Sequence, residues 1–174
     1  MLNILILRGL PGNGKTFLRK MLVLACKKRG LKVEFVNKDL IRKDLGGCLY
    51  QFTKANEEEV VETYRRVWCR LVKKKLDVLI SDCTNIKQEE LKWHFMINYP
   101  QEVHFTVLQL GDAASDIRET LPVAVQARMR TDMIESDNFI DAMLTHDLGQ
   151  LVCIQPRSAI EGGVGELLNE ILIN

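Results

Sequence analysis

A glycine-rich segment near the N-terminus, Gly9 to Thr16, constrains the fold of this chain more than any other feature. Its residues, Gly-Leu-Pro-Gly-Asn-Gly-Lys-Thr, match the pattern G-x-x-x-x-G-K-[ST], in which backbone N–H groups surround a phosphate. The segment follows the apolar run Ile4 to Leu7 and precedes a stretch with helical spacing. Because the motif operates between a strand and a helix, this context predicts an α/β fold that binds a nucleotide.

The residue types in this loop have separate physical roles. Gly9 can adopt backbone angles that other residues avoid, and Gly12 and Gly14 lack the Cβ atoms that would keep a phosphate away from the main chain. The first turn of the next helix adds unpaired N–H donors and the positive end of its dipole. Lys15 is expected to reach the β- and γ-phosphates, and Thr16 to place its hydroxyl on Mg²⁺. The alternative is a glycine-rich turn that happens to precede a Lys-Thr pair.

Length and composition favour one domain over residues 1–174. The chain has 174 residues of which 47% are hydrophobic, enough for one substantial core. No apolar run approaches the ~20 residues of a membrane span, and the N-terminal apolar stretch leads directly into the phosphate loop, which argues against a secretion signal. The five cysteines are widely spaced and include no C-x-x-C pair. Reduced thiols and a cytoplasmic location are therefore expected.

Charge is distributed unevenly along the chain. Residues 1–100 contain 20 Lys and Arg against 11 Asp and Glu, a balance of +9, whereas residues 101–174 contain 4 against 12, a balance of −8. Such an asymmetry can steer a polyanion to one side of a protein. Solvated helix faces, such as the one at Lys73 to Lys75, would explain it equally well.

Apolar runs alternate with helical patterns through most of the chain, and this alternation predicts a parallel sheet of about four to five strands flanked by helices. Trp68 lies in the apolar stripe of a long helix and is expected in the core. We expect strands at 3–8, 32–37, 77–81, 102–110 and 151–155, and helices at 15–29, 39–46, 87–98, 137–144 and 165–173, with a further long helix capped by Asn56.

Polar residues follow the first three expected strands, where ligands bind in open parallel sheets. The second such segment is Asn37 to Arg42, in which Asp39 could accept the proton of an attacking hydroxyl. Arg42, three residues later on the same helical face, could hold an anionic group of the acceptor. The alternative is that Asp39 caps the helix beginning there and that Arg42 is its solvated partner.

The third segment is Asp82 to Asn85. Asp82 is placed as a carboxylate on the water shell of the metal would be, and Thr84 or Asn85 could hydrogen-bond the acceptor or the loop. A polar turn after a strand is the alternative. Further along, a possible lid at about 112–133 contains arginines that could close over the γ-phosphate or simply contribute surface charge: Arg118, Arg128 and Arg130.

Together these segments resemble the kinase domain of phage-type polynucleotide 5′-kinases, within the wider group of P-loop kinases that includes zeta toxins and small-metabolite kinases. Gly9 to Thr16 matches the family pattern G-x-P-G-x-G-K-[ST], in which Pro11 goes beyond the general motif. Asn37 to Arg42 resembles N-R-D-x-x-R, and Asp82 to Asn85 resembles D-x-T-N. The similarity spans about residues 1–110.

The resemblance implies a three-layer P-loop kinase fold, with Asp39 as general base, Arg42 on the acceptor strand and Thr84 near it. The family's R-N-x-x-R lid has no clear match, since only Arg118 or the pair Arg128 and Arg130 are offered. The D-x-D-G-T phosphatase motif is absent, so no phosphatase activity is implied.

The leading hypothesis is a kinase that uses ATP and Mg²⁺ to phosphorylate the 5′-hydroxyl of DNA or RNA. The alternatives are a kinase for a small acceptor such as a nucleotide, sugar or aminoacyl group, and a nucleotide-binding regulatory protein with little turnover. In each case we expect the nucleotide to contact Gly9, Pro11, Gly12, Asn13, Gly14, Lys15 and Thr16.

Overall fold

Five parallel strands form a single sheet in the order β2-β3-β1-β4-β5. The computed structural model describes residues 1–111, 122–146, 149–154 and 158–172. The strands are β1 (Leu2–Arg8), β2 (Val33–Val36), β3 (Val78–Asp82), β4 (Val103–Leu110) and β5 (Gln150–Ile154). The predicted α/β fold with a parallel sheet of four to five strands is therefore confirmed.

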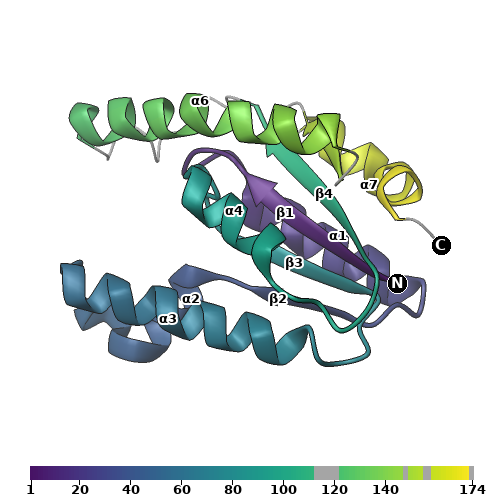
Figure 1. Cartoon of the computed structure of the whole chain (residues 1–174), viewed down its shortest axis with the longest axis horizontal. Coiled ribbons are helices and arrows are strands. Elements are labelled where there is room, and N and C mark those ends of the chain that lie inside the picture. Colours follow the sequence, from purple (N-terminus) through teal and green to yellow (C-terminus); the bar gives the residue numbers. More distant parts are fainter. Residues whose placement is uncertain (112–121, 147–148, 155–157, 173–174) are drawn as a thin grey trace.

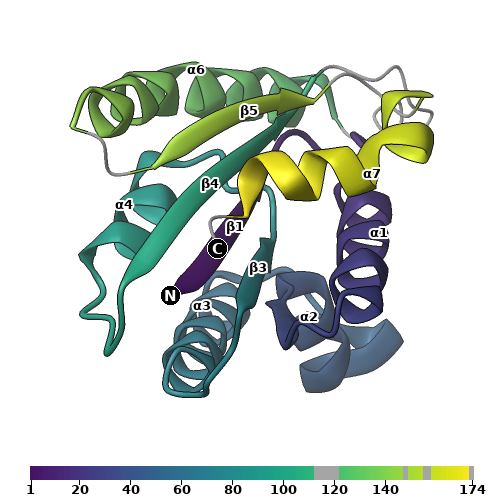
Figure 2. The ribbon, with the colours of Figure 1, turned by 90° about the vertical axis from the view of Figure 1, so that its right-hand side faces the viewer.

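Helices cover both faces of this sheet and make a three-layer structure (Figure 1). Figure 2, which is turned by 90° from Figure 1, shows α1 and α7 on one face of the sheet and α3, α4 and α6 on the other. The helices are α1 (Lys15–Lys28), α2 (Lys38–Gly46), α3 (Lys54–Leu71), α4 (Gln88–Met96), α6 (Val123–Thr145) and α7 (Ser158–Ile171), with a short 3₁₀ helix, η1, at Gly47–Leu49.

The central strand β1 divides the core into two layers, because successive side chains of a strand point to opposite faces. Ile4 and Ile6 pack into the layer that contains Trp68, which is fully buried as predicted. Leu5 and Leu7 pack on the opposite face with the apolar residues of α1 and α7. The continuous apolar run at the start of the chain is thus explained by burial of β1 on both faces.

Three predicted helix boundaries are wrong. The closing helix expected at 165–173 is α7, which already begins at Ser158. The other two differ for local reasons. The cap of α3 is Thr53, whose side chain accepts the N–H of Asn56 at 3.2 Å, and not Asn56 itself. The Asn56 side chain instead donates to the carbonyl of Gln51 at 2.8 Å. The helix expected at 137–144 is the end of the 23-residue α6, since Pro122 has φ −53° and precedes a helix rather than interrupting one.

Arg8, at the end of β1, anchors α6 to the sheet. Its fully buried guanidinium donates from Nη2 to Ser136 Oγ at 2.7 Å and forms an ion pair with Asp137 at 2.8 Å. It also bonds the side chain of Gln109 on β4. A buried charge must be paired to be tolerated, so this cluster fixes where α6 can lie.

In the part of the chain that the structure describes, no helix combines the length and apolar character needed to cross a membrane. The cysteines described there, Cys26, Cys69, Cys83 and Cys153, are free thiols. Burial raises the pKa of Cys26 to about 11 and that of Cys83 to about 12. These two thiols are therefore poor nucleophiles at neutral pH.

Candidate active site

The phosphate loop joins β1 to α1 in the conformation that its glycines permit. Gly9, Gly12 and Gly14 all have positive φ, at 151°, 83° and 85°. A Cβ on Gly9 would lie 3.1 Å from the carbonyl oxygen of Leu110, which is tighter than most Cβ contacts, so both contact and conformation disfavour a side chain there. The Asn13 amide donates to the carbonyls of Leu110 at 3.2 Å and Gly111 at 2.8 Å, which ties the loop to the end of β4.

Lys15 and Thr16 lie on the first turn of α1, at the end of the loop. The ammonium of Lys15 donates to the carbonyls of Gly9 at 2.8 Å and Leu10 at 2.7 Å, which places it against the inner curve of the loop. Thr16 is exposed. The cap residue of α1 is Gly14, which has no side chain to bond the first N–H groups. The first turn can therefore offer these donors and its dipole to an anion.

Hydrogen bonds bring the ends of β1, β2 and β3 together at the carboxyl edge of the sheet. The Asn37 amide, after β2, donates to the carbonyl of Asp82 at 2.7 Å. The N–H of Gly9, after β1, donates to the carbonyl of Thr84 at 3.1 Å. The three polar segments, which begin at Gly9, Asn37 and Asp82, therefore lie next to one another at this edge.

Asn37, and not Asp39, caps α2. Its side-chain oxygen accepts the N–H of Leu40 at 2.9 Å. The alternative that Asp39 is merely a helix cap is therefore excluded. The Asp39 side chain is 84% exposed and forms an ion pair with Arg42, so its carboxylate can be reached by a substrate.

Arg42 is held from its other side by Glu57 of α3. The carboxylate of Glu57 accepts from Nε at 2.9 Å and from Nη2 at 2.7 Å, a two-point arrangement that fixes the guanidinium plane. These hydrogen bonds lower the pKa of Glu57 and raise that of Arg42. The hydroxyl of Tyr50 donates to the same carboxylate at 2.8 Å. Sequence reasoning missed Glu57, because nothing local to α2 shows that the first turns of α3 pack against it.

Asp82 is buried at the end of β3 and its carboxylate pairs with Arg19 of α1 at 3.0 Å. Arg19, which the sequence analysis did not single out, also lies over the ring of Phe35, 4.1 Å from its centroid. The hydroxyl of Thr16 and the carboxylate of Asp82 are oxygen donors of the type that Mg²⁺ accepts, and a Mg²⁺ site that relies on substrate phosphates needs few protein ligands. In the described residues no group of three or more His, Cys, Asp and Glu gathers as a metal site.

The candidate acceptor residues after β3 have different surroundings. Asn85 is buried with φ 49°, and its amide donates to the carbonyl of Leu7 at 2.7 Å and to Ser81 Oγ at 3.0 Å. It thus holds this segment against β1. Thr84, in contrast, lines an open cleft together with residues of α4 and α6.

This cleft has a volume of about 450 Å³ and brings Arg128 to the same hollow as Thr84. Arg130 does not line it, because residues two apart on a helix point about 200° apart. Of the predicted lid, residues 112–121 and with them Arg118 lie outside the described residues, and the remainder is the first half of α6. The side chains at the cleft are Thr84, Ile86, Lys87, Glu90, Ala124, Val125, Arg128, Met129 and Asp132.

No protein-family model and no curated protein sequence matches this chain. Its fold, in contrast, resembles known structures. A candidate kinase from Chloroflexus aurantiacus has a TM-score of 0.56 and 14% identity, with 97% of this chain and 93% of the other covered. Chaetomium thermophilum Kti12, solved in complex with ADP-AlF3, has a TM-score of 0.56 and 15% identity, with 98% and 100% covered.

A third structure, of the protein APE1195, has a TM-score of 0.56 and 16% identity, with 97% of this chain and 93% of the other covered. Identities this low show the fold alone. That fold is the three-layer α/β fold of P-loop kinases, as the sequence predicted.

Proposed function

We propose that this protein is an ATP- and Mg²⁺-dependent phosphotransferase that moves the γ-phosphate of ATP to the 5′-hydroxyl of DNA or RNA. The observation that carries the proposal is the meeting of three parts at one edge of the sheet. These are the phosphate loop, the exposed pair Asp39 and Arg42 on α2, and the cleft shared by Thr84 and Arg128. Phosphoryl transfer needs little more than a cradle, a cation, a positioned nucleophile and charges on the moving group.

The phosphate loop supplies the donor half of this site. The N–H groups at the start of α1 and the ammonium of Lys15 would bind the β- and γ-phosphates. Thr16 and Asp82 would hold Mg²⁺, which neutralises charge on the phosphate oxygens when bound. Arg128 lines the neighbouring cleft and is the better placed of the two lid arginines that the structure describes, Arg128 and Arg130, to meet the γ-phosphate.

The pair on α2 supplies the acceptor half. Asp39 would take the proton of the attacking hydroxyl, since its carboxylate is exposed and oriented by Arg42. Glu57 holds Nε and Nη2 of Arg42, and Asp39 accepts from Nη1, so the guanidinium is fixed in place and an anionic acceptor would share Nη1 with Asp39. The ring of Phe52, 77% exposed, lies 5.5 Å from the Arg42 guanidinium. An exposed aromatic ring beside an arginine is a surface on which a nucleobase can stack, which favours a polynucleotide acceptor.

A small-molecule acceptor is the second candidate, and the cleft at Thr84 favours it. Its volume of about 450 Å³ falls within the range of small-ligand pockets. A nucleotide-binding regulatory protein with little turnover is the third candidate. An exposed ion pair such as Asp39 with Arg42 would look the same on an inert helix surface.

Incubation with γ-labelled ATP and a panel of acceptors separates these candidates. The panel holds 5′-hydroxyl DNA and RNA oligonucleotides, nucleosides and sugars, with the 5′-phosphorylated form of each oligonucleotide as the matched control. We expect label on the 5′-hydroxyl oligonucleotides and none on their phosphorylated forms. If only a small acceptor is labelled, the second candidate, a small-molecule kinase, replaces the polynucleotide proposal. If the protein binds ATP tightly but labels no acceptor, the third candidate, a regulatory protein, is favoured.

A further inference from the structure

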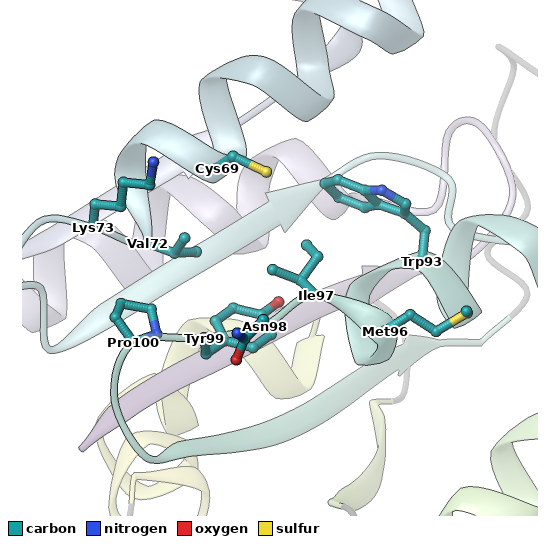
Figure 3. A pocket seen from close by; sticks show the side chains of 9 residues that line it. All are labelled: Cys69, Val72, Lys73, Trp93, Met96, Ile97, Asn98, Tyr99 and Pro100. Carbon is teal, nitrogen blue, oxygen red and sulfur yellow. The ribbon is translucent and has the colours of Figure 1, made fainter.

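A second hollow lies at the opposite edge of the sheet from the phosphate loop, near the amino ends of β3 and β4. It has a volume of about 550 Å³ and is bounded by the last turns of α3 and α4 and by the segment between α4 and β4 (Figure 3). Its lining comes from Cys69, Val72, Lys73, Trp93, Met96, Ile97, Asn98, Tyr99 and Pro100. We propose that it binds a small molecule that carries a flat apolar ring and an acidic group.

The apolar wall of this hollow is rigid before any ligand arrives. The Tyr99 hydroxyl donates to the carbonyl of His94 at 2.8 Å and accepts from the indole N–H of the buried Trp68 at 3.3 Å. Trp93 packs edge-to-face against His94, with ring centroids 5.1 Å apart, and against Trp68, at 6.4 Å. Two aromatic side chains fixed from behind present a preformed surface, which lowers the entropic cost of binding a flat group.

The charge at the hollow is positive. Lys73 lies at one end and Trp93 at the other, with Cys69, Ile97 and Tyr99 between them (Figure 3). None of the nine lining residues is acidic. The neighbouring Lys74 pairs with Glu34 at 3.7 Å, whereas no ion pair with Lys73 is found in the described part of the chain. An acidic group at this end would therefore gain a cation without breaking an existing pair.

The dimensions favour a small molecule as the occupant. Pockets for such ligands have volumes of about 300–1,000 Å³ and combine apolar walls with a few polar groups. Here the polar groups are the ammonium of Lys73, the thiol of Cys69 and the amide of Asn98. Met96, 82% exposed at the rim, adds a flexible apolar side chain that can adapt to the ligand.

Two matched fluorescent probes test the proposal on the intact chain. Anilinonaphthalene sulfonate has a flat apolar body with an acidic group, and phenylnaphthylamine has the same ring system without the charge. We expect one-to-one binding of both probes in the presence of saturating ATP. Lys73→Gln should weaken binding of the sulfonate about twofold to fivefold and leave binding of the neutral probe unchanged, in line with the worth of a single exposed charge contact. Lys75→Gln, two positions along the chain and outside the lining, is the control and should change the binding of neither probe.

Blocking the hollow gives a second readout. Ile97→Trp should fill the hollow and abolish binding of both probes. A second measurement does not depend on the folding of this variant: alkylation of Cys69 is followed in a chain that retains Ile97. That chain carries Cys48→Ser and Cys153→Ser, which remove two other thiols. Cys26 and Cys83 are buried, so Cys69 is the reactive thiol that remains. The sulfonate probe should slow its alkylation at least fivefold. Failure of both probes to bind, displacement by ATP, or unprotected Cys69 would overturn the proposal. None of these measurements depends on phosphotransfer, so the proposed ligand site can be tested separately from the proposed activity.

Discussion

At the scale of single residues, Lys15 is the side chain on which nucleotide binding depends. Its ammonium already lies against the inner curve of the loop, held by the carbonyls of Gly9 and Leu10. A phosphate in the loop would exchange these neutral acceptors for charged ones. Charge-assisted hydrogen bonds contribute about 1.5–3 kcal/mol.

We therefore expect Lys15→Ala to weaken ATP binding about tenfold to a hundredfold, measured by titration calorimetry. Lys20→Ala, an exposed lysine of the same helix, is the matched control and should bind ATP normally. Unchanged affinity in Lys15→Ala would show that the loop does not hold the nucleotide.

Glu57 is a positioning residue for the proposed acceptor side, since it fixes two of the nitrogens of Arg42. Glu57→Gln keeps the shape of the side chain and removes the charge that orients the guanidinium. We expect kcat/KM for the acceptor to fall about tenfold, equivalent to about 1.4 kcal/mol, with ATP affinity retained. Glu58→Gln, one position along and paired only loosely with Lys54 at 3.9 Å, should leave both unchanged. Equal losses in the two variants would contradict the role of Glu57.

His94 makes stability depend on pH. It is buried beside Tyr64, and burial, with a smaller contribution from Lys38, lowers its pKa from 6.5 to about 3. Between these two values the unfolded chain binds a proton that the folded chain does not, so stability is complete above pH 6.5 and falls as the pH drops toward 3. The slope is about 1.4 kcal/mol per pH unit.

Urea unfolding should therefore give a free energy about 2 kcal/mol lower at pH 5 than at pH 7. His94→Leu should remove most of this difference, whereas His146→Leu, at an exposed position, should retain it. A difference that survives in His94→Leu would assign the pH dependence to other groups.

At the scale of elements, the position of α6 depends on Arg8. The guanidinium connects the end of β1 to Ser136 and Asp137 on the helix and to Gln109 on β4. Arg8→Met fills the space but leaves these polar groups without their donor. We expect a loss of about 2–4 kcal/mol in the free energy of unfolding, measured in urea. Asp141→Asn, further along α6, is the control and should cost less than about 0.5 kcal/mol.

The strands could be predicted from the sequence because each is a short apolar run followed by polar residues, and burial on both faces leaves such a run few alternatives. The first helix was equally clear, since its apolar spacing ends at Gly30. The extent of α6 was not, because its exposed surface breaks the apolar pattern. Its position is set by Arg8, whose partners are more than 100 positions away in the sequence.

The candidate site was predictable only in part for the same reason. The loop, Asp39 and Asp82 stand out because each motif is local. Glu57 and Arg19, which hold Arg42 and Asp82, are identified by contacts between elements that no spacing in the sequence reveals. That Thr84 and Arg128 line the same cleft likewise depends on where α6 packs, which the sequence does not reveal.

At the scale of the whole molecule, the charge asymmetry of the sequence becomes spatial. The helices with an acidic excess, α6 and α7, lie along one side of the molecule, and α2 and α3, whose basic and acidic residues nearly balance, lie along the other (Figure 1). The proposed acceptor residues Asp39 and Arg42 belong to α2, on the side away from the acidic helices. A polyanionic acceptor would approach from there, with an affinity that decreases as salt is added.

Label transfer by Asp39→Asn, with ATP binding measured on the same preparation, tests the central proposal most directly. A general base contributes about a hundredfold to ten-thousandfold to a rate. We expect a loss of this size in transfer from γ-labelled ATP to a 5′-hydroxyl oligonucleotide, with ATP affinity within about twofold of the unmodified protein. Transfer at an unchanged rate in Asp39→Asn, or none in either protein while ATP binds tightly, would contradict it.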